Sequence, residues 1–145
     1  MGVRGMNIDG DDRLVDMSVI NPDCEIITMT ENGYGKRSDI EDYRLQSRGG
    51  KGIKAGVFNE KTGKLVSLKL ITAEDDIMII SENGTIIKVA SDDISKIGRA
   101  TQGVKVMRIE DSRVSKLAVT PRSEEDDSED GNADGTEIAE QQTEE

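Results

Sequence analysis

The chain has 145 residues, of which 34% are apolar, enough for one modest core or a few small repeated units. It contains no histidine and a single cysteine, Cys24, which excludes imidazole catalysis, histidine-ligated metals and internal disulfides. Most of the net charge of −11 lies in residues 122–145, which hold eleven acids and one base. The first 121 residues hold nineteen acids and eighteen bases, so the overall charge says little about what they bind.

Short segments rich in Val, Ile and Thr follow one another with turn residues between them, which predicts an all-β fold. A Glu-Asn-Gly turn occurs twice and predicts hairpins with type I′ turns, because Asn and Gly accept positive φ angles. Ser38 and Glu41 have the spacing of a capping box, and Ser91 stands at the matching place, so we expect one helical turn in each unit. The expected strands cover residues 2–8, 13–19, 25–30, 35–37, 52–57, 64–70, 76–81, 85–89, 103–109 and 114–119.

A unit of about fifty residues occurs twice and then begins a third time, with copies that start near residues 2, 52 and 103. Such a period indicates a repeat architecture, in which each unit buries its apolar face against a neighbour. About four strands per unit is typical of a propeller-like blade. We therefore expect blades over residues 1–120, forming a partial disc of about two to two and a half blades. The third unit ends after two strands, so we expect its strands to need a partner.

Residues 121–145 differ in composition from the rest of the chain. They carry a dense run of acids with Ile138 as the only sizeable apolar residue. Such a segment cannot bury enough apolar surface to offset its ordering entropy, so we expect a disordered acidic tail. A polyanion tethered in this way could compete with nucleic acid for a basic surface.

Basic residues recur at equivalent positions of the copies. Each member of the first set follows an apolar residue on an expected strand, so the base faces outward while its neighbour faces inward. The glycine-rich run 46–52 could bring its backbone close to a phosphate. A row of such bases suits a phosphate backbone, although a solvated strand face or a connector between blades would have the same composition. The candidate DNA-binding residues are Arg4, Lys54 and Lys105, the pair Arg48 and Arg99, the pair Arg37 and Lys88, and Lys51.

Several motifs together resemble the C-terminal domain of bacterial DNA gyrase A, part of a type IIA DNA topoisomerase, and the resemblance covers about residues 1–119. The run 46–52 is similar to the family's heptapeptide Gln-Arg-Arg-Gly-Gly-Lys-Gly, with Ser47 in place of the first arginine. The other motifs are Glu31-Asn32-Gly33-Tyr34-Gly35-Lys36-Arg37, Asp93-Ile94-Ser95-Lys96-Ile97-Gly98-Arg99 and Thr101-Gln102-Gly103-Val104.

The resemblance implies a β-pinwheel whose blades exchange strands and wrap double-stranded DNA around a basic rim. It implies a cytoplasmic, nucleoid-associated bacterial protein that works with the rest of gyrase A and with gyrase B in an A2B2 complex. That enzyme would use ATP and Mg²⁺ to introduce negative supercoils. We expect no catalytic residue, cofactor, metal site or membrane contact in this chain.

Two other interpretations remain open at the level of sequence. The equivalent C-terminal domain of topoisomerase IV is one, and a propeller-type module that binds proteins and not DNA is another. An outer edge with as many acids as bases at equivalent positions would favour the protein-binding module.

Overall fold

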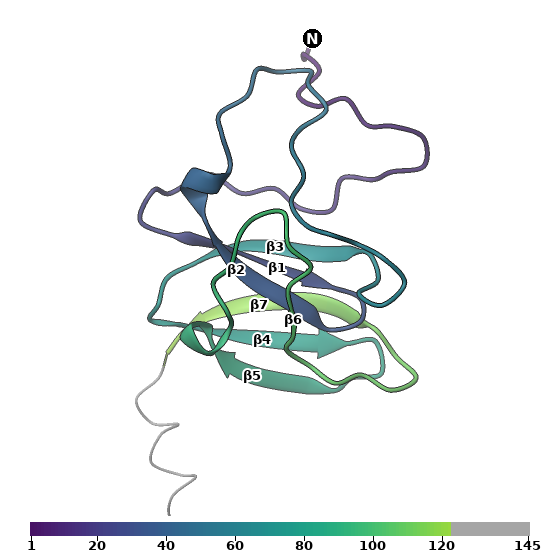
Figure 1. The fold of residues 1–145 in the computed structure, drawn as a ribbon, viewed down its shortest axis with the longest axis vertical. Coiled ribbons are helices and arrows are strands. Elements are labelled where there is room, and N and C mark those ends of the chain that lie inside the picture. Colours follow the sequence, from purple (N-terminus) through teal and green to yellow (C-terminus); the bar gives the residue numbers. More distant parts are fainter. Residues whose placement is uncertain (123–145) are drawn as a thin grey trace, which may run out of the picture.

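A computed structural model describes residues 1–122, and the predicted tail lies outside them from residue 123 onward. These residues form two antiparallel sheets, stacked one above the other in Figure 1, which confirms the predicted all-β class. The first sheet has the order β3-β1-β2-β6 and the second β5-β4-β7. The elements are β1 (Glu25–Thr30), β2 (Tyr34–Asp39), η1 (Ile40–Asp42), β3 (Leu65–Ile71), β4 (Asp75–Ser81), β5 (Ile86–Ala90), η2 (Ser91–Asp93), β6 (Val104–Lys105) and β7 (Val114–Pro121).

Strands of later copies complete the sheets of earlier ones. The hairpin β1–β2 belongs to the first copy, and β3 of the second copy pairs with β1, Ile27 lying opposite Lys69. In the same way β7 of the third copy pairs with β4 of the second copy, with Ile77 opposite Val119. This is the strand exchange expected of a pinwheel, and it explains why no single copy forms a complete sheet.

The core lies where the two sheets meet, with β3 packed against β7. Its central side chains, which include Ile27, Met29, Ile77, Ile79 and Leu117, are at most 1% exposed. Burial of one such side chain stabilises the fold by about 1.5–3 kcal/mol. In the strand orders, β6 and β5 lie at the edges opposite β3 and β7.

Three of the predicted strands are absent from the described residues. Segments 2–8, 13–19 and 52–57 form no β-strand, and the bridge in them joins Met6 to Gly50 in parallel. The segment 103–109 shortens to Val104–Lys105. Sequence alternation identifies a segment that can form a strand, but a strand also needs a neighbour that accepts its backbone hydrogen bonds.

The predicted turn type and capping box are wrong. Gly33 and Gly84 have φ of 84° and 88°, whereas Asn32 is not among the residues with positive φ. Gly33 N–H donates to Thr30 O at 3.1 Å, so the turn is type I followed by a left-handed glycine. Both helical turns are single 3₁₀ turns without a side-chain cap, because Ser38 and Ser91 donate to carbonyls of other segments.

No helix within residues 1–122 is long and apolar enough to cross a membrane.

Candidate nucleic-acid interface

The glycine-rich run 46–52 docks on the segment that opens the first copy. Asn7 N–H donates to Gly50 O at 2.8 Å, and Gly49 N–H donates to Gly5 O at 3.0 Å. These bonds bring Arg48 and Arg4, each next to a bonded glycine, to one part of the surface. Both side chains are exposed.

The same contact recurs one copy later. Val57 N–H donates to Thr101 O at 3.2 Å, the bond equivalent to that between Asn7 and Gly50. Next to it, the Arg99 guanidinium donates to Asp42 O at 2.9 Å through Nε and to Lys54 O through Nη1. The structure thus brings together Lys54 and Arg99, which are 45 residues apart in the chain. The Arg99 guanidinium, however, donates to backbone carbonyls of the protein.

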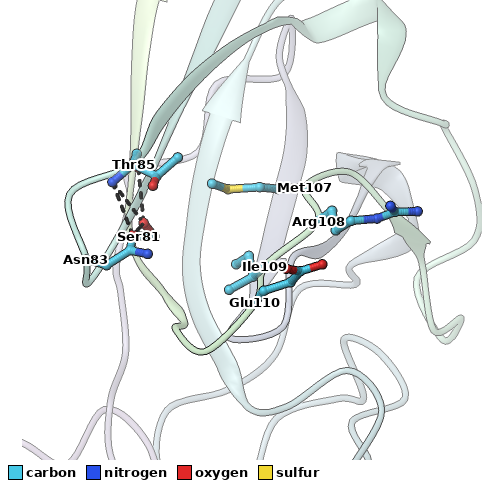
Figure 2. Close-up of a pocket in the computed structure, with 7 residues that line it drawn as sticks. All are labelled: Ser81, Asn83, Thr85, Met107, Arg108, Ile109 and Glu110. Atoms are coloured by element: carbon cyan, nitrogen blue, oxygen red, sulfur yellow. Dashed lines mark hydrogen bonds between the residues drawn. The ribbon is translucent and has the colours of Figure 1, made fainter.

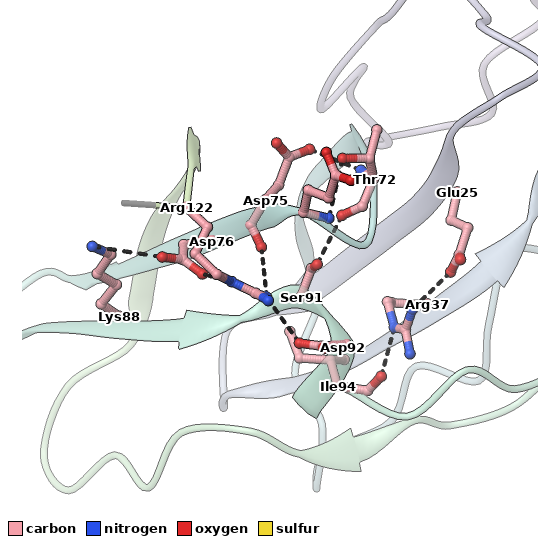
Figure 3. Close-up of polar contacts among 11 residues, drawn as sticks. Glu25, Arg37, Thr72, Asp75, Asp76, Lys88, Ser91, Asp92, Ile94 and Arg122 are labelled. Atoms are coloured by element: carbon pink, nitrogen blue, oxygen red, sulfur yellow. Dashed lines mark hydrogen bonds and ion pairs between the residues drawn. The ribbon is translucent and has the colours of Figure 1, made fainter. Parts of the chain in front are cut away.

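Arg37 and Lys88 also form internal contacts, which Figure 3 shows. The Arg37 side chain is 13% exposed, pairs with Glu25 at 3.0 Å and donates to Ile94 O at 2.6 Å. Lys88 pairs with the buried carboxylate of Asp76 at 3.6 Å. These bases hold elements together, and their predicted DNA contacts stay a prediction.

The other candidate bases face solvent. Lys51 is exposed and pairs loosely with Asp9 at 3.5 Å. The Lys105 ammonium lies 5.7 Å from the centre of the Tyr34 ring, and Lys61 lies 5.8 Å from the same ring. Within residues 1–122, no carboxylate forms an ion pair with Arg4, Arg48, Lys54 or Lys105. Their charges are therefore available to a polyanion.

Lys36 is a buried base that joins the first hairpin to the end of the second copy. The residue is 3% exposed, and its ammonium donates to Gly98 O at 3.3 Å, to Thr101 O at 2.7 Å and to Arg99 O. Burial, with a smaller contribution from the nearby Arg99 charge, lowers the pKa of Lys36 from 10.5 to about 8. Lys36 therefore positions the backbone around Arg99.

Sequence reasoning missed a further set of equivalent bases, Arg13, Lys64 and Arg113. Each is exposed and directly precedes one of three equivalent apolar residues, Leu14, Leu65 and Val114. Arg113 pairs with Glu31 at 3.6 Å, and Lys64 lines the same hollow of about 560 Å³ as Arg113. Superposing the copies at Leu14, Leu65 and Val114 would have identified this set.

No group of three or more Cys, Asp or Glu residues within the described part of the chain is placed to hold a metal ion.

Copies that contribute strands to the sheets of their neighbours, and that carry bases at equivalent positions, define a strand-exchanged, propeller-like module. The chain belongs to the family described as DNA gyrase C-terminal domain, beta-propeller, which it matches over residues 1–21, 25–72 and 75–121.

Curated relatives and solved structures agree with this assignment. The chain is 40% identical over 143 residues to DNA gyrase A of Staphylococcus aureus (strain MRSA252), covering 94% of this chain and 16% of that protein. It is 38% identical over 146 residues to DNA gyrase A of strain NCTC 8325 / PS 47, covering 99% of this chain and 16% of that protein. The chain therefore spans about a sixth of the length of these relatives.

Two solved structures share the fold. The DNA gyrase A C-terminal domain superposes with a TM-score of 0.64 at 22% identity, over 68% of this chain and 33% of that one. The C-terminal domain of DNA topoisomerase IV superposes with a TM-score of 0.75 at 20% identity, over 82% of this chain and 38% of that one. The topoisomerase IV alternative is thus supported as a related fold, while the curated relatives named above are gyrase proteins.

Proposed function

We propose that this chain binds and wraps double-stranded DNA as part of a DNA gyrase A protein. One observation carries the proposal. The equivalent bases Arg4, Lys54 and Lys105 are all exposed, and none is neutralised by a carboxylate of residues 1–122. Bases repeated once per copy match a ligand that is itself periodic in charge and follows a curved surface.

The proposed contacts go to phosphate and not to base edges. Arg48 would add a second base beside Arg4, and Lys61 would add one beside Lys105. Such contacts fix the path of DNA without reading its sequence. Further contacts along the rim would offset the free energy that bending the DNA costs. We assign strand breakage and the use of ATP and Mg²⁺ to other parts of an A2B2 enzyme, and wrapping would present one segment of DNA to the gate of that enzyme in a fixed handedness.

The test is the dependence of DNA affinity on salt in two matched triple variants. The first replaces Arg4, Lys54 and Lys105 with Gln, and the second replaces Arg13, Lys64 and Arg113, so both remove three positive charges. Each phosphate contact that is lost should reduce the slope of log affinity against log salt by about 0.9, so the first variant should lose roughly 2.7. The second variant should lose less of the slope, because Arg113 is already paired with Glu31 at 3.6 Å.

Equal slopes in the two variants would show that any three positive charges contribute alike, whatever their position, and would contradict the proposed contacts. DNA binding that is weak and independent of both sets would favour a protein-interaction module instead.

Wrapping is separate from binding and needs its own measurement. Relaxed closed circular DNA is incubated with the chain, treated with a type I topoisomerase and stripped of protein. A shift in linking number that disappears in the first triple variant supports wrapping. Unchanged linking number at saturating protein would restrict the proposal to binding.

A further inference from the structure

Two ammonium groups meet at the ring of Tyr34 in the first sheet. The Nζ of Lys105 lies 5.7 Å from the centre of the ring and the Nζ of Lys61 lies 5.8 Å from it, both within the range of a cation–π contact. Tyr34 is 8% exposed, whereas both lysines are exposed. The ring is therefore a buried support for two charged groups at the surface.

The three residues come from three different copies of the repeat. Tyr34 begins β2 of the first copy, and Lys105 of the third copy lies directly opposite it on β6. Side chains that lie directly opposite on antiparallel strands share one face of the sheet. Lys61 belongs to the turn 59–63 of the second copy, which precedes β3. The exchange of strands between copies thus brings the three side chains together at the four-stranded sheet.

Hydrogen bonds fix the turn that carries Lys61. The carboxamide oxygen of Asn59 accepts bonds from Lys61 N–H at 3.0 Å and from Thr62 N–H at 3.1 Å. The Asn32 side chain, in the turn between β1 and β2, donates to Glu60 O and to Lys61 O, each at 3.1 Å. Asn32 N–H donates to Thr62 O at 3.0 Å, and Thr62 is fully buried. The backbone of Lys61 is thus fixed relative to the hairpin that carries the ring.

The charges of the two lysines are available to an anion. Within residues 1–122, no carboxylate forms an ion pair with Lys61 or Lys105. Glu31, in the same hairpin turn as the ring, pairs with Arg113 at 3.6 Å and accepts a bond from Lys64 N–H at 3.0 Å. Two positive charges held beside one ring attract an anion more strongly than either does alone.

The matching place of the second copy is built differently. Thr85 stands where Tyr34 stands in the first copy. Glu110 stands where Lys61 stands, four residues before the first residue of β7 as Lys61 is before that of β3. Thr85 and Glu110 line one hollow of about 250 Å³, as Figure 2 shows, and the residues of 1–122 that line it include no aromatic side chain. The pair of lysines at a ring is therefore a feature of the first sheet, and the repeat does not by itself produce it.

We propose that Lys61 and Lys105, held by the ring of Tyr34, form one binding site for a phosphate group of the DNA backbone. The site rests on the proposed function, because its ligand belongs to the DNA that the chain binds. A lysine side chain loses rotamer freedom when it holds an anion, and contact with the ring removes part of that freedom beforehand. Tyr34 is then a positioning residue, which acts on DNA through the two lysines.

Binding of duplex DNA to the full chain at several salt concentrations tests the site. Lys61→Gln should reduce the slope of log affinity against log salt by about 0.9, the value for one lost phosphate contact. Lys64→Gln is the matched control, because it removes the same charge from an exposed position three residues further along the chain, and it should reduce the slope less.

The result separates this site from the proposed function. Equal slopes for Lys61→Gln and Lys64→Gln would overturn the site, while a loss of slope in the triple variant of Arg4, Lys54 and Lys105 would still support DNA binding by the chain. Wild-type binding that does not depend on salt would overturn both.

Substitution of the ring tests positioning without a change of charge. Tyr34→Leu should weaken DNA binding about threefold to tenfold at constant salt and keep the slope, because both lysines remain. Tyr34→Phe should bind DNA as the wild-type chain does, since it keeps the aromatic face. Because Tyr34 is buried, unfolding in urea is used to show that each variant is folded. Equal affinity of the Leu variant and the wild-type chain, or equal losses in the Leu and Phe variants, would overturn the role of the ring.

A double-mutant comparison distinguishes positioning from a general effect on the fold. When Lys61 and Lys105 are both replaced with Gln, Tyr34→Leu should cause no further loss of DNA affinity. A further loss as large as in the wild-type background would mean that the ring does not act through the lysines, and it would overturn the proposal.

Discussion

Gly33 and Gly84 occupy equivalent places in the two hairpins and provide a matched pair of substitutions to alanine. Both have positive φ, which costs an L-residue about 1 kcal/mol in either hairpin. At Gly33 the new Cβ would also lie 2.2 Å from Met107 O, so the backbone after β6 must move by roughly 1 Å. At Gly84 the methyl group meets open space, so only the backbone cost remains.

The clash at Gly33 should add about 1–3 kcal/mol, the usual cost of overpacking. We therefore expect Gly33→Ala to lower the free energy of unfolding by about 2–4 kcal/mol and Gly84→Ala by about 1 kcal/mol. The assay is equilibrium unfolding in urea followed by far-ultraviolet circular dichroism, at concentrations where both variants are monomeric. Equal losses in the two variants would refute the reasoning, because they would mean that the chain after β6 does not lie against the first turn.

Two further predictions concern buried charge. Between pH 7 and 10 the wild-type chain should gain roughly 2–3 kcal/mol of stability relative to Lys36→Met. The pKa of Lys36, about 8, is below the unfolded value, so the cost of burying the ammonium is present below pH 8 and relieved as pH rises toward 10.5; a flat difference in urea unfolding would contradict this. Asp76→Asn should cost about 1–3 kcal/mol, because Lys88 and Arg122 lose a buried partner at 3.6 and 3.1 Å. Asp92→Asn removes an exposed partner of Arg122 and should cost less than about 1 kcal/mol in the same measurement, so similar losses would argue against the buried pair.

The repeat was visible in the sequence, and with it the all-β class, the main strands and the equivalent bases. These features depend on local patterns: alternation of side chains along a strand, and glycine or asparagine in turns. The strand pattern was reliable for β1, β3, β4 and β7, whose apolar side chains fill the core.

The sequence could not show which segments find a partner. Gly2-Val3-Arg4 and Gly103-Val104-Lys105 have nearly the same residues, yet only the second is a strand, because only it reaches the edge of β2. The same holds for the bases. Arg48 and Arg99 are equivalent in sequence, but Arg99 is tied to Asp42 and Lys54 while Arg48 stays exposed.

Composition and spacing by themselves determined that this chain is a β repeat with a base at a fixed place in each copy. The tertiary structure decided which of those bases remain available and which segments pair as strands. The physical reason is that alternation and turn chemistry act between neighbours in the chain, whereas hydrogen-bond partners and burial come from segments distant in sequence. Gly33 and Gly84 show this in one pair: the turn is the same, and only the chain passing over it differs.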